Sequence, residues 1–571
     1  MSEEQRQQAA AAQEQNIVRM ILEPYIDPNR LIRKYENAKR ARQTWDTKWQ
    51  IIQNHVFPDY RDYLNATAYK GAPQTSKIKA HTGAVSGLIN KVVSLISAKT
   101  CDPAVRWLDL KFEEDSFNQM FASRDWLYQC REALYRLFAQ PQSHFYTSTF
   151  SSLLDWFAIG TGCREIILRK DTGRIQFINV PMQDVFIDIS GYGDIDITYR
   201  RMQLTAHQAF QLWGEALHPK MQSLGIKEDQ TPTEQKHEFF EVVMQNPAIQ
   251  QFPGLNYVSC VIDKANKSVV DIGMHHLSPY VVSRFFVAPG ETYGRSYVWN
   301  AMPTISAINR LNKRQLQLLD FATNPPILVR DETTVNQRQL VPGGFIQGLD
   351  IDGRPTYQPM QFGANLPLLM EYYQSLLRDL EDALVARDVI PADAPNMTAT
   401  EVNQREIQAF NRIRPLIVRL ETEDLNHTVL RTLKLLEQTG KLPPFPYDDL
   451  GIYQEQMPDP IMQLRVTFGG QMAKMQRLQE IQDNEMLMNK ALMAAQQDPT
   501  VLDRINLDRL IAIDAEIIGN TNGVINSDQV VQQIREQRAK QQEAEQQAQQ
   551  QSMMIDNFIK MKEAGIGTTA E

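Results

Sequence analysis

Three basic side chains share one face of a predicted helix in the middle of the chain. Arg310, Lys313 and Arg314 lie within residues 303–321, where hydrophobic residues recur at helical spacing. At about 100° per residue the three cations face away from an apolar arc, which consists of Ile305, Ile308, Leu311, Leu316, Leu318 and Leu319. Guanidinium and ammonium groups bind phosphate oxygens, so this row offers contact with an anion. The alternative is the solvated face of an ordinary amphipathic helix.

Other groupings of polar residues give no catalytic or metal site. No phosphate-binding loop, G-x-G-x-x-G or G-x-S-x-G pattern occurs. His237 and Glu238 are followed by Glu241 instead of the second histidine of a zinc-protease helix, which favours a surface helix without a metal. His275 and His276 are interpreted as a solvated or packed pair at a strand end, and the clustered aspartates lack EF-hand spacing. We therefore predict no catalytic residue, no metal and no cofactor.

Composition excludes several classes of protein. The chain has 571 residues, 43% of them hydrophobic, and a net charge of −9. That charge argues against a protein that coats nucleic acid through a basic surface. The cysteines lie far apart without a C-x-x-C pair, as is typical of a reduced intracellular protein without disulfides or zinc. No signal peptide and no apolar run of about 18 residues occurs, so no membrane-spanning segment is expected.

The elements around the basic helix form a distinctive order. Pro325 and Pro326 end this helix, and residues 327–363 then show β-prone segments and turns. A β module of fewer than about 40 residues rarely folds without disulfides, metal or partners. Neither cysteines nor a metal-ligand cluster occur in it, so we expect oligomerisation to complete it. A second helix returns directly over about residues 366–387.

The flanking segments predict a mixed unit and a long helix. Before residue 290, helical patterns give way to a hairpin around residues 163–181 and further strands, with a helix near residues 205–214. A capping box at Thr398–Glu401 begins a helix that runs to Gly440, about 60 Å, and Pro415 should kink it. The last hundred or so residues are helical and end in a Gln-rich tail. The predicted fold class is α+β, predominantly helical.

Three segments, in this order, resemble one family. Residues 294–332, beginning GRSYVWNAMPTISAINRLN, are similar to a segment of the portal proteins of short-tailed bacteriophages, also called head-to-tail connecting proteins. Residues 397–443, beginning MTATEV and ending GKLP, resemble a second signature of that family. Residues 184–214, in which a Gly-bearing turn leads to YR and then to T-x-x-Q, resemble a third. The resemblance covers about residues 28–480.

The resemblance implies a portal-type subunit in a ring, usually of twelve copies, at one capsid vertex. Double-stranded DNA would be packaged and ejected through this ring. The implied parts are a polar N-terminal arm (1–27), an α+β wing (28–290), a first stem helix (291–325), a small β clip (326–364), a second stem helix (365–387), a tunnel loop (388–398), a long kinked wing helix (399–440), a wing return (441–480) and a helical crown with the Gln-rich tail (481–571). The loop comprises Asp388, Val389, Ile390, Pro391, Ala392, Asp393, Ala394, Pro395, Asn396, Met397 and Thr398.

Within such a ring the basic residues become candidates for the DNA channel. Arg310, Lys313 and Arg314 would make weak contacts with phosphate, since tight binding would stop DNA from sliding. Arg387, at the base of the tunnel loop, is a fourth candidate, with the acids Asp379, Glu381 and Asp382 near enough to pair with it.

The resemblance also implies partners and a location. The partners are other copies of the chain, the terminase large subunit, tail adaptor or nozzle proteins, and the major capsid, scaffolding and internal core proteins. No contact with a membrane is expected. The location is the head–tail junction of the virion, after assembly in the host cytoplasm. The alternatives are a cytosolic helical oligomeric scaffold without a DNA channel, and an enzyme on an unrecognised fold.

Overall fold

A computed structural model describes most of the chain up to residue 468. The described residues are 20–57, 82–169, 172–230, 235–323, 327–329, 357–359, 366–386, 414–450, 453 and 457–468, with short helical pieces among residues 484–493 and 531–555. Two compact units are distinguished, one of residues 1–117 with 122–470 and one of residues 118–121 with 471–571. In the second unit the described helical residues include exposed Met486 and Met493.

The larger sheet is an antiparallel meander of five strands in the order β4-β5-β6-β7-β8. The strands are β4 (Val185–Ile189), β5 (Ile195–Thr205), β6 (Lys236–Gln245), β7 (Tyr257–Asp263) and β8 (Ser268–His275). Helix α2 (Pro28–Val56) packs on one face, where the ring of Tyr35 stacks on that of Phe240 at 4.5 Å between centroids. Helices α7 (Ala206–Trp213) and α8 (Pro219–Gln230) contribute to a separate hydrophobic cluster with strands β6, β7 and β8.

A smaller antiparallel sheet has the order β3-β2-β9. Its strands are β2 (Thr161–Arg169), β3 (Arg174–Asn179) and β9 (Tyr280–Arg284). The predicted hairpin is therefore confirmed: β2 pairs with β3, and Gly173 takes a φ of +60° in the turn between them. Strands β7 and β9 likewise match β-prone segments of the sequence, and α7 begins with the capping box of Thr205 and Gln208.

Segments distant in sequence complete the core. Strand β1 (Leu108–Phe112) pairs with β12 (Leu464–Phe468), more than 350 residues later. A π-helical turn, Glu421–Leu425, leads into α14 (Asn426–Gln438), whose buried leucines pack with β1 and with α5 (Phe121–Phe138). Helix α14 is followed by Gly440 at a φ of +65°, the helix end that the sequence predicts. The described residues between 414 and 468 are thus part of the same core as described residues before 290.

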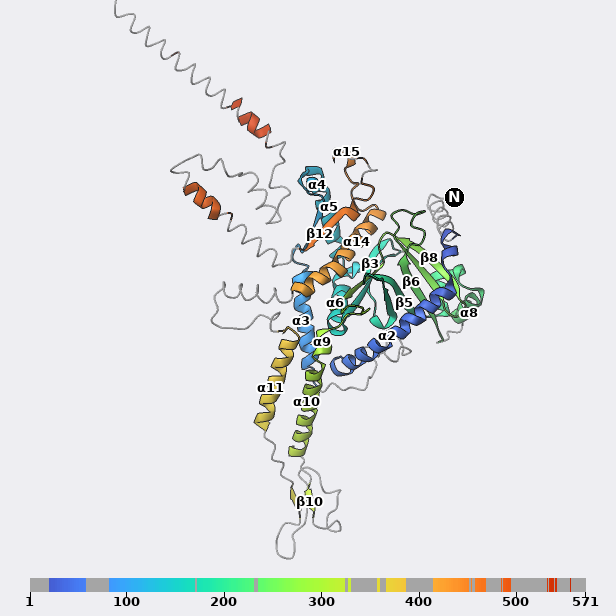
Figure 1. The fold of residues 1–571 in the computed structure, drawn as a ribbon, viewed down its shortest axis with the longest axis vertical. Coiled ribbons are helices and arrows are strands. Elements are labelled where there is room, and N and C mark those ends of the chain that lie inside the picture. Colours follow the sequence, from blue (N-terminus) through green and yellow to red (C-terminus); the bar gives the residue numbers. More distant parts are fainter. Residues whose placement is uncertain are drawn as a thin grey trace, which may run out of the picture. The chain divides into compact units, whose positions relative to one another are not determined.

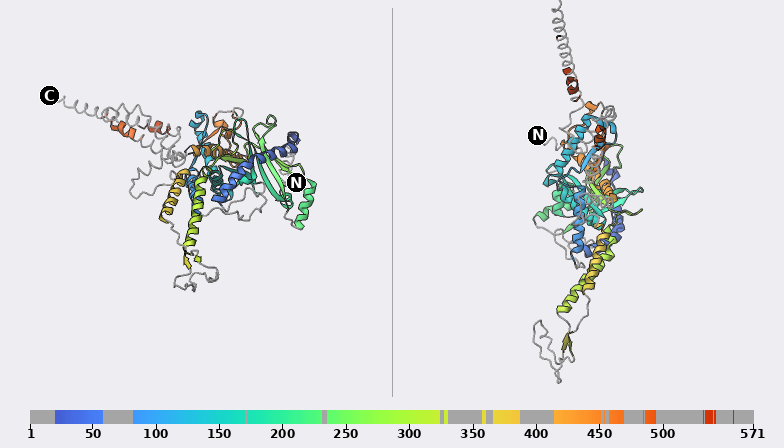
Figure 2. Two further views of the ribbon diagram at one scale, coloured as in Figure 1. Left: turned by 60° about the horizontal axis from the view of Figure 1, so that its bottom comes forward. Right: turned by 90° about the vertical axis from the view of Figure 1, so that its left-hand side faces the viewer.

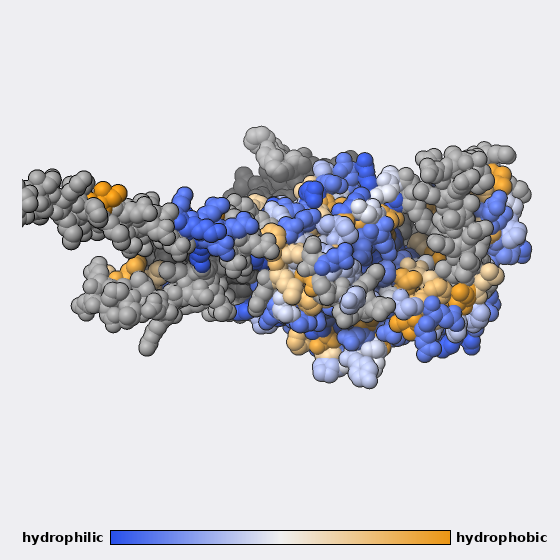
Figure 3. All heavy atoms as spheres, turned by 90° about the horizontal axis from the view of Figure 1, so that it is seen from above, coloured by the Kyte–Doolittle hydropathy of each residue, from blue (hydrophilic) through white to orange (hydrophobic). Residues whose placement is uncertain are grey.

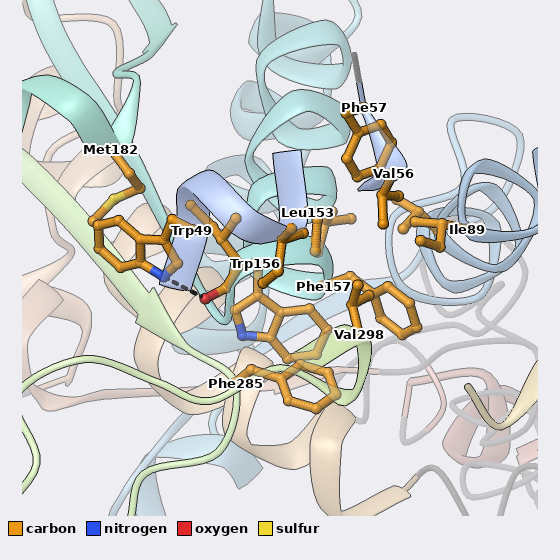
Figure 4. Close-up of a cluster of buried hydrophobic side chains, with 14 of the residues drawn as sticks. Trp49, Val56, Phe57, Ile89, Leu153, Trp156, Phe157, Met182, Phe285 and Val298 are labelled. Atoms are coloured by element: carbon orange, nitrogen blue, oxygen red, sulfur yellow. Dashed lines mark hydrogen bonds between the residues drawn. The ribbon is translucent and has the colours of Figure 1, made fainter. Parts of the chain in front are cut away.

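A central cluster joins the N-terminal helices to helices α10 and α11, whose bounds are given below. Figure 4 shows Trp156, Phe157, Phe285 and Val298 gathered in this cluster, and the indole nitrogen of Trp49 donates to the carbonyl oxygen of Ile159 at 3.0 Å. The helices that supply its other residues are α3 (Ala84–Thr100), α6 (Phe145–Ile159), α9 (Tyr297–Asn300), α10 (Met302–Thr323) and α11 (Leu366–Ala383).

Helices α10 and α11 lie side by side, as Figures 1 and 2 show. Beyond them β10 (Ile327–Val329) pairs with β11 (Tyr357–Pro359) in antiparallel register. The helices expected over residues 303–321 and from residue 366 are therefore confirmed. Most of the small β module, Arg387 and the whole loop 388–398 lie outside the described residues.

Two expectations need correction or stay open. His237, Glu238 and Glu241 lie in strand β6 and not on a surface helix, because cross-strand packing of Phe239 and Phe240 decides this segment. The kink expected at Pro415 stays open, because residues 399–413 just before it lie outside the described residues. Within the described part of this helix, the π-helical turn Glu421–Leu425 interrupts the regular α-helix.

Candidate nucleic-acid interface on helix α10

A short motif fixes the start of the helix that carries the basic residues. Tyr293 is buried, its ring meets that of Trp49 edge-on at 5.3 Å, and its hydroxyl accepts a hydrogen bond from the amide of Ile187 at 3.1 Å. Ser296 caps α9, accepting from the amide of Trp299 at 3.1 Å. The segment is thereby held on strand β4 and on helix α2 before α10 begins.

Gly294 crosses Gly160 at a distance that admits no side chain. A Cβ atom on Gly294 would lie 2.1 Å from the carbonyl oxygen of Gly160, and one on Gly160 would lie 2.3 Å from that of Gly294. The amide of Gly294 donates to the hydroxyl of Thr161 at 3.0 Å. The glycine of the sequence motif is therefore explained by close backbone approach, with β2 as its neighbour.

The first half of α10 is buried and the second half is not. Ile305 and Ile308 are fully buried in the central cluster. Asn309, also buried, donates through its side-chain amide to the carbonyl oxygen of His55 at the end of α2, at 3.1 Å. Leu316 and Leu319, on the same predicted arc, are about half exposed, at 52% and 49%. The apolar arc therefore continues past the point where the core ends.

The basic residues begin directly after this anchor. Arg310, Lys313 and Arg314 are all exposed. The Nε of Arg310 donates to the carbonyl oxygen of Ser306 in its own helix at 3.3 Å, which leaves the terminal nitrogens for other contacts. Among the described residues, no acidic side chain forms an ion pair with any of the three. The row can therefore contact an anion without first breaking an ion pair there.

The C-terminal end of helix α11 and the residue that follows it are buried in the central cluster. Leu380 and Leu384 are fully buried and Leu376 nearly so. Met370 and Tyr372, nearer the start of the helix, are 59% and 55% exposed. The two helices thus share a pattern: an anchored end in the core and an end whose hydrophobic residues remain uncovered within one copy of the chain.

Comparison with known proteins identifies the chain. A family model described as bacteriophage head to tail connecting protein matches residues 29–525. The chain belongs to this family. It is similar to the "Probable portal protein" of Bordetella phage BPP-1, with 22% identity over 89% of this chain and 90% of the relative. It is equally similar to the "Portal protein" of Salmonella phage epsilon15, with 22% identity over 90% of this chain and 91% of the relative.

Membership of the connector family decides between the alternatives. The chain is a structural component of the phage virion at the head–tail junction and not an enzyme, as the resemblance of its motifs predicted. The interpretations as a cytosolic scaffold and as an unrecognised enzyme are therefore wrong. None of the described helices is long and apolar enough to cross a membrane.

The histidines that the sequence places side by side, His275 and His276, make structural contacts. No group of histidine, cysteine and acidic residues in the described part of the chain is arranged to hold a metal ion. His275 is packed against Ser259, with 3.0 Å between Nε2 and Oγ, and burial, with Arg431 nearby, lowers its pKa to about 3. His276 meets the carbonyl oxygen of Gly254 at 2.9 Å.

A buried charge cluster was not predicted from the sequence. Tyr280 donates its hydroxyl hydrogen to Glu241 at 2.5 Å, and its oxygen is 3.3 Å from Glu165, which also pairs with Arg200. Burial, together with the charge of Glu165, raises the pKa of Glu241 to about 7. The cluster comes from strands β2, β5, β6 and β9, so it couples the two sheets.

Proposed function

We propose that copies of this connector form a closed ring whose axial channel carries double-stranded DNA during packaging and ejection. The proposal is supported by the two relatives, which are named as a portal protein and a probable portal protein. It is also supported by the exposed hydrophobic side chains of α10 and α11. Twelve copies is the number we propose for the ring.

The main support for a ring is the exposed hydrophobic side chains on the two neighbouring helices, α10 and α11. Leu316 on α10 and Met370 and Tyr372 on α11 are each more than half exposed. Single exposed hydrophobic residues are ordinary on a protein surface, and the face drawn in Figure 3 mixes hydrophobic and hydrophilic residues in this way. Several on one helix pair beyond the core are typical of a surface that a second copy covers. Neighbouring copies in a ring would bury them.

The parts of the subunit are proposed as follows. Helices α10 and α11 belong to the stem, within residues 291–325 and 365–387. Residues 326–364 form the clip, and residues 388–398 form the tunnel loop. The wing comprises residues 28–290 with the long helix 399–440 and the return 441–480, the polar arm is residues 1–27, and the crown is residues 481–571.

The basic row is proposed to face the channel. Arg310, Lys313 and Arg314 would then present repeated positive charge to phosphates around the ring, and Arg387 would add to it near the loop 388–398. Contacts with phosphate carry no sequence information. Their strength falls as salt rises, because binding releases counterions from DNA. Weak contacts of this kind would slow the loss of DNA from a filled particle and would still let DNA slide through the channel during packaging and ejection.

The same proposal assigns partners by position. The clip end would meet the terminase large subunit during packaging and the tail adaptor or nozzle proteins afterwards. The wing would meet the major capsid and scaffolding proteins, and the crown would meet internal core proteins. Assembly would take place in the host cytoplasm.

A paired substitution tests whether the uncovered helix ends hold the ring together. In Leu316→Gln with Met370→Gln, we expect an unchanged circular dichroism spectrum and the loss of rings by sedimentation velocity. The control is Leu212→Gln with Met462→Gln, which makes the same changes at residues 63% and 37% exposed on other elements. Rings that survive the first pair as well as the second would contradict the proposal.

A further inference from the structure

Helix α2 carries a second row of hydrogen-bond donors on its exposed side. Arg30, Arg33, Asn37, Arg40 and Thr44 recur at intervals of three and four residues, so they lie along one face of the helix. All five are exposed. We call them the α2 row. At about 1.5 Å per residue the row is about 21 Å long, comparable with six base pairs of DNA.

The acids of α2 are engaged elsewhere. The helix has seven basic residues and two acidic ones, in a chain of net charge −9. Asp46 pairs with buried Arg42 at 2.9 Å, and Glu36 pairs with Lys264, in the turn after strand β7, at 2.6 Å. The remaining contact described for the row's cations is that of the Nε of Arg33, which donates to the carbonyl oxygen of Asn29 at 3.4 Å. Among the described residues none of these guanidinium groups forms an ion pair; the pKa of Glu36 is lowered mainly by Lys264 and to a smaller extent by Arg40.

The opposite side of α2 explains why these residues point outward. Leu31, Tyr35 and Trp49 are buried, and Arg42 donates to the carbonyl oxygens of Met182 and Gln183 at 2.7 and 2.9 Å. The helix is therefore fixed on the sheet by one face. Its C-terminal end meets α10 through the bond from Asn309 to His55, next to the first residue of the basic row on α10. The α2 row thus leads away from the proposed channel residues along the surface of the same subunit.

We infer that the α2 row is a second, sequence-independent contact site for the sugar–phosphate backbone of double-stranded DNA, outside the row on α10. This inference rests on the proposed function, which supplies DNA as the ligand. Arginine, asparagine and threonine are among the side chains that bind phosphate oxygens. An acidic protein partner fits less well, since the row has no large hydrophobic residue for the core of a protein interface.

The test measures the salt dependence of DNA binding by the full-length protein. A short fluorescent duplex of arbitrary sequence is titrated with the wild type and with Arg30→Gln/Arg33→Gln/Arg40→Gln, by anisotropy. Each lost phosphate contact reduces the slope of log affinity against log salt by about 0.9. Three lost contacts reduce it by about 2.7, so between 50 and 200 mM salt the wild type should lose about 40-fold more affinity than the variant.

Two further variants make the result specific. Arg124→Gln/Arg136→Gln/Lys220→Gln removes the same charge at exposed positions on α5 and α8, and its slope should match that of the wild type. Arg30→Lys/Arg33→Lys/Arg40→Lys keeps the charge and should keep most of the slope. Equal slopes for the α2 and control variants would overturn the inference.

Ring formation, followed by native mass spectrometry, separates this inference from the proposed function. Rings in the wild type and in every variant, with a reduced slope only in the α2 Gln variant, would support both. Loss of rings in the α2 Gln variant alone would show that the row contacts a neighbouring copy, and would overturn the inference while leaving the ring intact as a proposal. Absence of rings in the wild type, also after addition of scaffolding and capsid proteins, would contradict the proposed function, and the slopes would still decide the role of the row.

Discussion

Arg164 on strand β2 and Asp424 in the π-helical turn form an ion pair that is almost fully excluded from solvent. The side chains are 0% and 4% exposed and are 260 residues apart in sequence. The same guanidinium also donates to the hydroxyls of Thr149 and of Thr428, the latter at 3.0 Å. Burial lowers the pKa of Arg164 to about 10, so the group remains charged at neutral pH. The long helix is therefore tied to the smaller sheet by a buried charge.

Removing the Asp424 carboxylate should lower the free energy of unfolding far more than removing a carboxylate from an ion pair on the surface. Asp424→Ala leaves the Arg164 guanidinium buried without its counter-charge, and breaking a buried pair in this way costs about 3–5 kcal/mol. Urea denaturation measures the free energy of unfolding. The control is Glu132→Ala, which removes the partner of half-exposed Arg106 and should change stability little. Equal effects of the two substitutions would show that the pair does not hold the long helix.

The glycine crossing should tolerate no methyl group. Gly294→Ala places a Cβ atom against the backbone of Gly160 and Phe285, and neither can move aside as a flexible side chain would. We expect a loss of about 3 kcal/mol or more, at the upper end of what overpacking costs. Gly191→Ala is the matched control, since a Cβ atom there meets nothing within 4 Å. A thermal unfolding midpoint that is the same for both variants would contradict the crossing.

Stability should depend on pH through Glu241. Its folded pKa of about 7 is above the ordinary value of 4.5, so the folded chain holds a proton that the unfolded chain releases between these values. The free energy of unfolding therefore falls as pH rises from about 4.5 to 7, and Glu241→Gln removes that fall. Urea denaturation across this range should show the variant gaining stability relative to the wild type as pH rises. The exposed Glu113→Gln serves as the control, and parallel curves for all three proteins would contradict the assignment.

The basic row on α10 should affect DNA and not assembly. Replacing Arg310, Lys313 and Arg314 by alanine removes exposed charge from a helix whose anchor residues are unchanged. We expect rings to form normally and packaged DNA to be lost faster from filled particles, because the phosphate contacts that retain it are gone. The measurement is DNA release over time from particles assembled with variant rings. Packaging and retention equal to those of the wild type would assign the row to an ordinary solvated helix face.

Sequence patterns predicted the helices, turns and helix ends that depend on residues close together in the chain. The helix of α10, the hairpin with Gly173 and the helix end at Gly440 each follow from residues within a few positions of one another. Strand β6 was predicted wrongly, because residues 236–245 lack strict alternation and their strand state depends on pairing with β5 and β7.

The contacts that hold the site were not predictable, because each joins distant segments. Gly294 needs Gly160, and Asn309 needs His55, in each case more than 130 residues away. The pair of Arg164 and Asp424 depends on a π-helical turn that no sequence pattern announces. The exposure of Leu316 likewise could not be predicted, since helical periodicity places a residue on a face but does not say where the core beneath that face ends.

The mass of the purified protein under native conditions, with negative-stain images of the same sample, tests most directly whether the chain forms a ring. We predict a closed ring of about a dozen copies with a central hole. A monomer or dimer that still forms no ring after addition of scaffolding and capsid proteins would contradict it.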